Sequence, residues 1–146
     1  MAKALRSAPS WEKVVALTES GQLSAIDYDR LVRGKFTFGS FIRAAEDVGF
    51  RAEALATRFM SRSKFFELKK QPKAELPAEL VETMLRAIRV RQLANEVFRN
   101  REKTDRFMSS PHPALGGRTP LEAVETGFGA EAVRDLLGRA LAGVAA

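Results

Sequence analysis

The chain of 146 residues contains no cysteine and a single histidine, His112. Without cysteine there is no disulfide framework and no thiolate metal site, which fits a reducing cytoplasm. One histidine and no spaced cluster of histidine and carboxylate residues leave little from which to assemble a metal site or an activated nucleophile. The sequence therefore predicts a protein that is not an enzyme and that holds no metal or cofactor.

Long apolar runs and strand signals are also missing. No stretch approaches the roughly 18 apolar residues that span a bilayer, and the basic Lys3 and Arg6 are not followed by the apolar segment of a secretory signal. There is no period-two alternation and no Asn-Gly hairpin turn. We therefore expect an all-α protein of the cytoplasm, without a membrane partner.

Positive charge is concentrated in the first half of the chain. Residues 1–74 hold 14 Lys and Arg against 8 Asp and Glu, whereas residues 75–146 hold 10 of each. Within residues 51–73, seven basic side chains face two acidic ones. A local positive field of this kind attracts polyanions, nucleic acid first among them. A basic face that is merely solvated explains the same charge.

Apolar residues at helical spacing, together with capping residues, predict a series of helices. Residues 71–75, with Pro72, and then Pro77 indicate a linker at the point where the charge balance changes, which divides the chain into domains 1–74 and 75–146. The predicted helices are Ser10–Glu19, Ser24–Arg33, Phe38–Val48, Arg51–Phe59, Arg62–Lys70, Pro77–Phe98, Arg101–Met108, Pro120–Thr126 and Ala130 to about Ala142.

Residues 51–70 have the layout of a helix-turn-helix, with a short turn at Met60-Ser61 and a basic second helix. Met60 stands where such turns usually favour glycine. In this arrangement the second helix enters the major groove of DNA. Alternatively, Phe65 and Phe66 pack this helix into a bundle that does not bind DNA. The residues predicted to contact DNA are Arg62, Ser63 and Lys64 near base edges and Lys69 and Lys70 at phosphates.

The stretch from His112 to Glu122 combines a turn, two glycines and a helix start. Thr119 as N-cap, Pro120 at the first helical position and Glu122 at the third complete a capping box, so a helix begins at Pro120. Gly116 and Gly117 permit positive φ. Three roles remain open for this loop: a capped interhelical turn, a phosphate cradle made of backbone N–H groups, or a protein-binding loop. His112 is expected to be exposed or to bond a backbone carbonyl.

The run HPALGGRTPLEAV, followed near the C-terminus by AVRDLLGRALAG, resembles the toxin-binding domain of the MbcA/ParS/Xre family of bacterial antitoxins. The resemblance covers roughly Leu80 to Ala146. It implies that the partner is a RES-type toxin, which acts on NAD and has a fold similar to that of ADP-ribosyltransferases. It also implies that the antitoxin works by occluding the toxin's active site. The positions that match the family motif and are predicted to bind toxin or to shape the binding domain are Pro113, Leu115, Gly116, Gly117, Arg118, Thr119, Pro120, Leu136, Leu137, Gly138 and Arg139. Leu121 also matches the motif.

Physical chemistry divides these matched residues further. Leu121, Leu136 and Leu137 are expected in the core, whereas Arg118, Arg139 and the tail after Gly138 are the better contact candidates. Arginine offers a planar fork of five donors that can occupy the place of an anionic dinucleotide.

Together these features predict an antitoxin with an N-terminal Xre-like helix-turn-helix bundle and a small helical toxin-binding domain. We expect it to neutralise its toxin, to repress its own operon by binding operator DNA, and to form a homodimer, with the helix Pro77–Phe98 as one possible surface. One alternative is a transcriptional regulator whose C-terminal domain serves oligomerisation only. Another is a small phosphate-binding enzyme that depends on Gly117 and Arg118.

Overall fold

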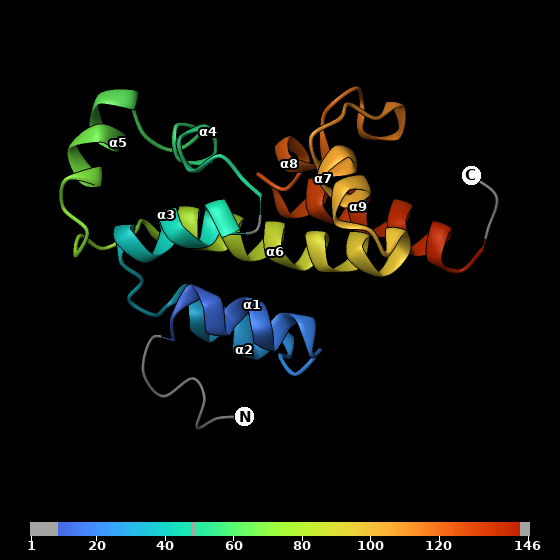
Figure 1. The fold of residues 1–146 in the computed structure, drawn as a ribbon, viewed down its shortest axis with the longest axis horizontal. Coiled ribbons are helices and arrows are strands. Elements are labelled where there is room, and N and C mark those ends of the chain that lie inside the picture. The colour runs from blue at the N-terminus through green and yellow to red at the C-terminus, as the bar shows by residue number, and fades with distance from the viewer. Residues whose placement is uncertain (1–8, 48, 144–146) are drawn as a thin grey trace. The chain divides into compact units, whose positions relative to one another are not determined.

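The computed structural model describes residues 9–47 and 49–143, and every regular element in these ranges is a helix (Figure 1). An isolated antiparallel bridge joins Thr37 and Glu75. The prediction of an all-α fold is confirmed. In chain order the elements are α1 (Trp11–Glu19), α2 (Ala25–Val32), α3 (Phe38–Asp47), α4 (Ala52–Ala56), α5 (Arg62–Lys69), α6 (Ala78–Phe98), α7 (Arg101–Met108), the 3₁₀ turn η2 (Pro113–Leu115), α8 (Pro120–Ala123) and α9 (Gly127–Leu141).

Two helices are shorter than predicted. α4 stops at Ala56 rather than at Phe59, because the N–H groups of Arg58 and Phe59 donate three residues back, to the Leu55 and Ala56 carbonyls at 3.3 and 2.9 Å, instead of four. α8 stops at Ala123 rather than at Thr126. The predicted end of the third helix at Val48 lies outside the described residues.

By packing, the chain divides into two compact units, residues 1–84 and 85–146. The division falls inside α6, whereas the sequence places a boundary between residues 74 and 75. The predicted linker is a bonded segment of the first unit. Its carbonyls at Pro72 and Ala74 accept from Gly39 and Phe38 at 3.0 and 2.8 Å. This segment therefore belongs to the packing of α3.

Aromatic side chains build the core of the first unit. Trp11 of α1 stacks on Phe36 with ring centroids 4.3 Å apart, and Phe38 of α3 lies 5.5 Å from Phe65 of α5. All four rings are buried. Each such pair adds about 0.5–1.5 kcal/mol beyond the burial of its area. Phe65 therefore ties α5 to the start of α3.

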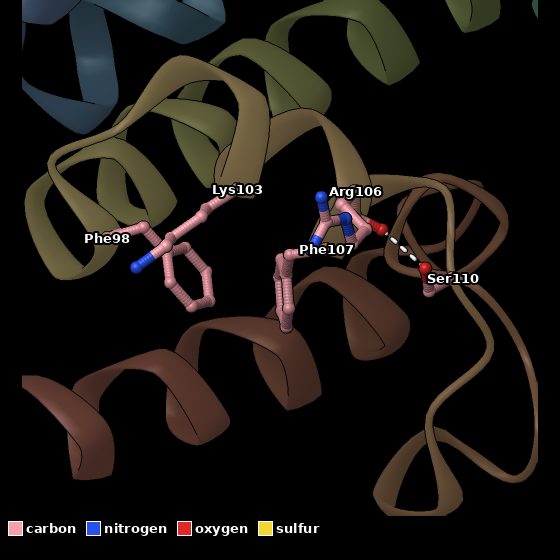
Figure 2. A pocket seen from close by; sticks show the side chains of 5 residues that line it. All are labelled: Phe98, Lys103, Arg106, Phe107 and Ser110. Carbon is pink, nitrogen blue, oxygen red and sulfur yellow. Dashed lines mark hydrogen bonds between the residues drawn. The ribbon is translucent and has the colours of Figure 1, made fainter.

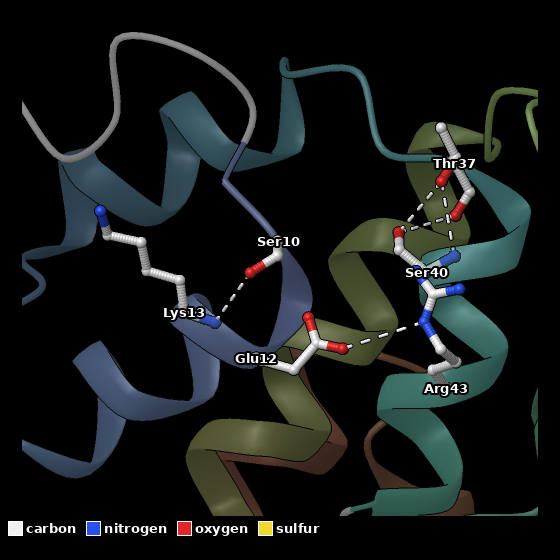
Figure 3. Close-up of polar contacts among 6 residues, drawn as sticks. All are labelled: Ser10, Glu12, Lys13, Thr37, Ser40 and Arg43. Atoms are coloured by element: carbon white, nitrogen blue, oxygen red, sulfur yellow. Dashed lines mark hydrogen bonds and ion pairs between the residues drawn. The ribbon is translucent and has the colours of Figure 1, made fainter.

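Polar contacts hold the starts of α1 and α3 (Figure 3). Ser10 caps α1 by accepting from the N–H of Lys13 at 3.3 Å. At the start of α3 the Ser40 hydroxyl donates to the Thr37 carbonyl at 3.0 Å. Between the two helices, Arg43 and Glu12 form an exposed ion pair at 4.0 Å, which contributes at most about 1 kcal/mol. The aromatic core, not this pair, joins α1 to α3.

The long helix α6 is buried along most of its length. Leu80, Met84, Val90 and Ala94 are fully buried, and Leu85 and Ile88 are each 3% exposed. Leu93, Val97 and Phe98, nearer the end of the helix, are half-buried, so the use of this helix as one possible dimer surface stays a prediction.

Within the second unit, α6 also anchors α7 and α8. The buried Arg91 pairs with Asp105 of α7, Nη2 to Oδ1, at 2.6 Å. Arg86 donates from Nε to the Val124 carbonyl at 2.7 Å and from Nη2 to the Glu125 carbonyl at 2.9 Å. These two carbonyls follow α8, and bonding to Arg86 in place of a further helical turn accounts for the early end of that helix.

Candidate functional site

The Gly-Gly loop, residues 112–118, is closed by hydrogen bonds between its ends. The N–H of His112 donates to the Arg118 carbonyl at 3.0 Å, and the His112 carbonyl accepts from Leu115 and Gly117 at 3.0 and 3.1 Å. The ring Nδ1 of His112 accepts from the N–H of Ala114 at 3.1 Å and so caps η2. The expectation that His112 is exposed or bonds a carbonyl is wrong, because the half-buried imidazole is an acceptor inside the loop.

Two consecutive glycines reverse the chain in this loop. Gly116 and Gly117 have φ angles of 66° and 80°, as predicted, a region that glycine enters without steric cost. Their N–H groups and that of Arg118 all donate to carbonyls inside the loop. A phosphate cradle needs these donors free. The phosphate-binding alternative therefore lacks the groups on which it depends.

The loop leads directly into α8, which begins at Pro120 as predicted. The N–H of Glu122 donates to the Thr119 hydroxyl oxygen, and the N–H of Thr119 donates to the Glu122 carboxylate, both at 3.0 Å. The predicted capping box is confirmed. Such a cap contributes about 1 kcal/mol, so the direction in which the chain leaves the loop is set locally.

The start of α9 differs from the prediction. α9 begins at Gly127 rather than at Ala130, so the predicted break over residues 127–129 is wrong. Thr126 caps the helix by accepting from the N–H of Gly129 at 3.0 Å. A Cβ on Gly129 would collide with the Ala123 carbonyl oxygen at the end of α8. Glycine here allows two helices to meet closely and does not end a helix.

The predicted toxin-binding residues lie in one packed substructure, since η2 and α8 both contact α9. Of the three leucines expected in the core, only Leu137 is buried; Leu121 and Leu136 are half-buried. In the tail after Gly138, residues 144–146 lie outside the described residues. By exposure, Leu115, Pro120 and Leu137 are buried, Thr119, Leu136 and Gly138 are half-buried, and Pro113, Gly116, Gly117, Arg118 and Arg139 are exposed.

Two large apolar side chains on α9 are exposed and were not among the predicted site residues. Phe128 is 86% exposed and Leu141 is 51% exposed. The buried residues of α9 are Ala130, Val133 and Leu137. Phe128 does not share their helical spacing, and this pattern in the sequence could have predicted that it faces outward. Exposed aromatic residues are frequent anchors of protein interfaces.

A shallow pocket of about 330 Å³ lies where α6 meets α7 (Figure 2). Its apolar part consists of Phe98 and Phe107, whose ring centroids are 5.3 Å apart. No motif in the sequence indicated this pocket. The residues that line it are Phe98, Lys103, Arg106, Phe107 and Ser110, and we call it the Phe98–Phe107 pocket.

The predicted DNA-binding residues share the short helix α5 and its C-cap. Ser61 caps this helix by accepting from the N–H of Lys64 at 3.1 Å. α4 and α5 contact one another and both contact α3, which is the packing expected of a helix-turn-helix. All five predicted residues, Arg62, Ser63, Lys64, Lys69 and Lys70, are exposed.

Several side chains on α5 already have partners within the chain. Arg62 Nε lies 3.0 Å from Glu53 Oε1 of α4, and Lys64 Nζ lies 3.9 Å from Glu67 Oε1. The Phe66 ring is 40% exposed and lies 5.6 Å from the Arg62 guanidinium. Phe66 therefore does not pack inward as the bundle alternative requires of it.

Within the described ranges, no group of three or more His, Cys, Asp or Glu residues is arranged to hold a metal ion. None of the helices described there is long and apolar enough to cross a membrane.

Residues 93–143 match the family model of the antitoxin Xre/MbcA/ParS C-terminal toxin-binding domain. The match begins within α6 and includes α7, the Gly-Gly loop, α8 and α9. The resemblance predicted from the two sequence runs is thereby confirmed over these residues. No curated protein matches the chain.

Proposed function

We propose that this chain, which carries an antitoxin toxin-binding domain in residues 93–143, neutralises a RES-type toxin that acts on NAD. The family match is the observation that carries the proposal. The RES class follows from the resemblance of the runs HPALGGRTPLEAV and AVRDLLGRALAG. In this role the chain is a binding protein rather than an enzyme, and it requires no cofactor.

Neutralisation is proposed to work by occlusion of the toxin's active site. The Gly-Gly loop suits this role because its internal hydrogen bonds hold it in one shape before binding, which lowers the entropy cost of association. Arg118 and Arg139 are exposed on this domain. Their guanidinium groups can fill a site that otherwise receives an anionic dinucleotide. The exposed ring of Phe128 adds an apolar anchor.

Co-expression with a RES-type toxin, sought first among the products of the genes beside this chain's own, tests the proposal. The wild-type chain should restore growth and cellular NAD and should co-purify with the toxin. Arg118→Ala and Arg139→Ala should each weaken the complex, and Arg43→Ala, an exposed arginine of α3, is the matched control. A wild-type chain that neither binds nor protects would overturn the proposal and would favour a regulator whose C-terminal domain only oligomerises. Full protection by both arginine variants would exclude the dinucleotide-mimic mechanism.

We further propose that residues 1–74 bind operator DNA and repress the chain's own operon. The exposed cations of α5 and the net positive charge of residues 51–73 support this proposal. Glu53 of α4 orients the guanidinium of Arg62 through their ion pair. Lys69 and Lys70, at the end of α5, suit contacts with DNA phosphates, because such contacts need only positive charge and do not read the base sequence. Helix-turn-helix repressors commonly bind two-fold operators, so a homodimer in the cytoplasm is part of the proposal.

A further inference from the structure

We propose that the Phe98–Phe107 pocket is a second contact point for the toxin, and that it receives an apolar side chain that stands next to a carboxylate on the toxin surface. This inference rests on the proposed toxin-binding function and names the chemistry of the partner segment. The pocket lies wholly within residues 93–143, which match the toxin-binding domain. It lies outside the Gly-Gly loop and the α9 motif on which the resemblance rests.

The floor of the pocket is apolar and remains partly open to solvent. Phe98 and Phe107 are both half-buried, and their rings meet at an interplanar angle of 46° (Figure 2). A volume of about 330 Å³ is at the lower end of the range for small-molecule sites, which begins near 300 Å³. A single inserted side chain suits such a shallow space better than a cofactor does.

The rim of the pocket is positively charged. Lys103 and Arg106 line it, and both are exposed. The carboxylate of Glu102 pairs with Arg106 at 3.5 Å, but their side chains are 82% and 71% exposed, and such a pair contributes at most about 1 kcal/mol. Asp105, the other acid of α7, is paired with the buried Arg91 at 2.6 Å. A carboxylate from a partner therefore complements this rim.

The pocket is held in shape before any partner arrives. Asn100 caps α7 by accepting from the N–H of Lys103 at 2.9 Å. On the far side of the pocket, the Ser110 hydroxyl donates to the Arg106 carbonyl (Figure 2). The Arg91–Asp105 pair fixes α7 on α6. Little conformational freedom is lost when a side chain enters a preformed pocket, so most of the contact energy contributes to affinity.

The test measures, by titration calorimetry, how tightly full-length variants bind the purified RES-type toxin that the wild-type chain neutralises in the co-expression experiment. Lys103→Glu replaces one of the two rim cations by an anion at an exposed position, and Phe98→Ser removes half of the floor. Each should weaken binding about tenfold or more, as expected for a contact worth at least about 1.4 kcal/mol. Lys103→Arg should bind like the wild type. Lys13→Glu, on α1, makes the same change of net charge and is the matched control.

The outcomes separate this inference from the proposed function. If the wild type binds the toxin and Lys103→Glu binds equally well, the toxin-binding role stands and the pocket inference is wrong. If the wild type does not bind, both fail. Should Phe98→Ser lose its helical circular dichroism, the comparison of Lys103→Glu with Lys13→Glu decides alone. Equal weakening by Lys103→Glu and Lys13→Glu would indicate long-range steering and would also contradict the inference.

Discussion

Single residues decide the shape of the region that matches the toxin-binding domain. The imidazole of His112 accepts a backbone hydrogen bond at the start of η2, and Gly129 leaves room for a carbonyl at the end of α8. His112 is half-buried and Gly129 has no side chain, so neither offers a large surface to a partner. Both therefore affect toxin binding only through the backbone that they hold, and their substitutions are measured first as changes in stability.

His112→Ala should lower the free energy of unfolding by about 0.5–1.5 kcal/mol, the usual contribution of one hydrogen bond. The N–H of Ala114 loses its acceptor in this variant. His112→Asn should recover part of the loss, because an asparagine side chain accepts from the backbone two residues on. Urea unfolding of the three proteins measures the difference. Equal stability of the alanine variant and the wild type would show that the ring does not hold the loop.

Gly129→Ala should destabilise the chain, and Gly127→Ala should not. A Cβ at Gly129 collides with backbone at Ala123, which cannot move aside cheaply, whereas a Cβ at Gly127 has nothing within 4 Å. Alanine is favoured over glycine within a helix by about 1 kcal/mol, so the control variant should be as stable as the wild type or more so. Thermal unfolding compares them. A stable Gly129→Ala protein would mean that α8 and α9 do not meet as described.

Among the helices, side-chain caps set most of the described starts, and two of these caps are reciprocal boxes. The box at Thr119 and Glu122 opens α8, and the box at Ser24 and Asp27 opens α2. The second pair has an electrostatic consequence. The N–H and then the hydroxyl of Ser24, each 2.9 Å from Asp27 Oδ2, hold the pKa of that carboxyl below its ordinary value, with Arg30 adding to the effect and burial opposing it.

The Asp27 box should therefore contribute stability that depends on pH. A carboxyl with a lowered pKa in the folded state stabilises the fold above its unfolded-state pKa, and this contribution disappears as the pH falls through the folded-state pKa. Asp27→Asn should be less stable than the wild type at neutral pH. The difference should shrink once the pH falls below the ordinary value of 3.8. Denaturant unfolding across this range measures it, and a difference that stays constant with pH would contradict the assignment.

At the scale of the whole chain, charge is distributed unevenly, in line with the two proposed roles. The first 74 residues carry the excess of Lys and Arg, and residues 75–146 are balanced. A nucleic acid surface needs such an excess, because phosphate neutralisation supplies most non-specific affinity. A protein surface needs shape and a few well-placed charges. The two proposed activities should therefore respond differently to salt and to the loss of single lysines.

Replacing Lys69 and Lys70 by Gln should weaken DNA binding and leave the toxin complex unchanged. The probe is a duplex that carries the promoter of the chain's own gene, titrated at several salt concentrations. The slope of log affinity against log salt should fall by about two units, one for each phosphate contact. Lys13→Gln is the control of equal chemistry on α1. No wild-type binding at low salt, or an unchanged slope in the double variant, would exclude the assignment of α5 to DNA.

Short-range features were readable from the chain alone. The helix starts at Trp11, Ala25 and Pro120 each come directly after a capping serine or threonine. The positive φ of Gly116 and Gly117 is possible because glycine has no Cβ. These features depend only on residues that are close in sequence, so a few neighbouring residues determine them. The all-α class and the toxin-binding resemblance depend on the same local patterns.

Long-range contacts settled the remainder, because a sequence pattern does not state which surfaces meet. The sequence predicts a break between helices over residues 127–129, although Gly129 instead leaves room for the Ala123 carbonyl inside the fold. The sequence predicts a linker at residues 71–75, although two carbonyls of this segment accept hydrogen bonds from the start of α3. The apolar pattern of α6 does not say which of its residues are covered; Leu80 and Met84 are buried, whereas Val97 and Phe98 are half-buried. The Phe98–Phe107 pocket requires the end of one helix and a later turn of the next to converge, and such convergence exists only in the folded molecule.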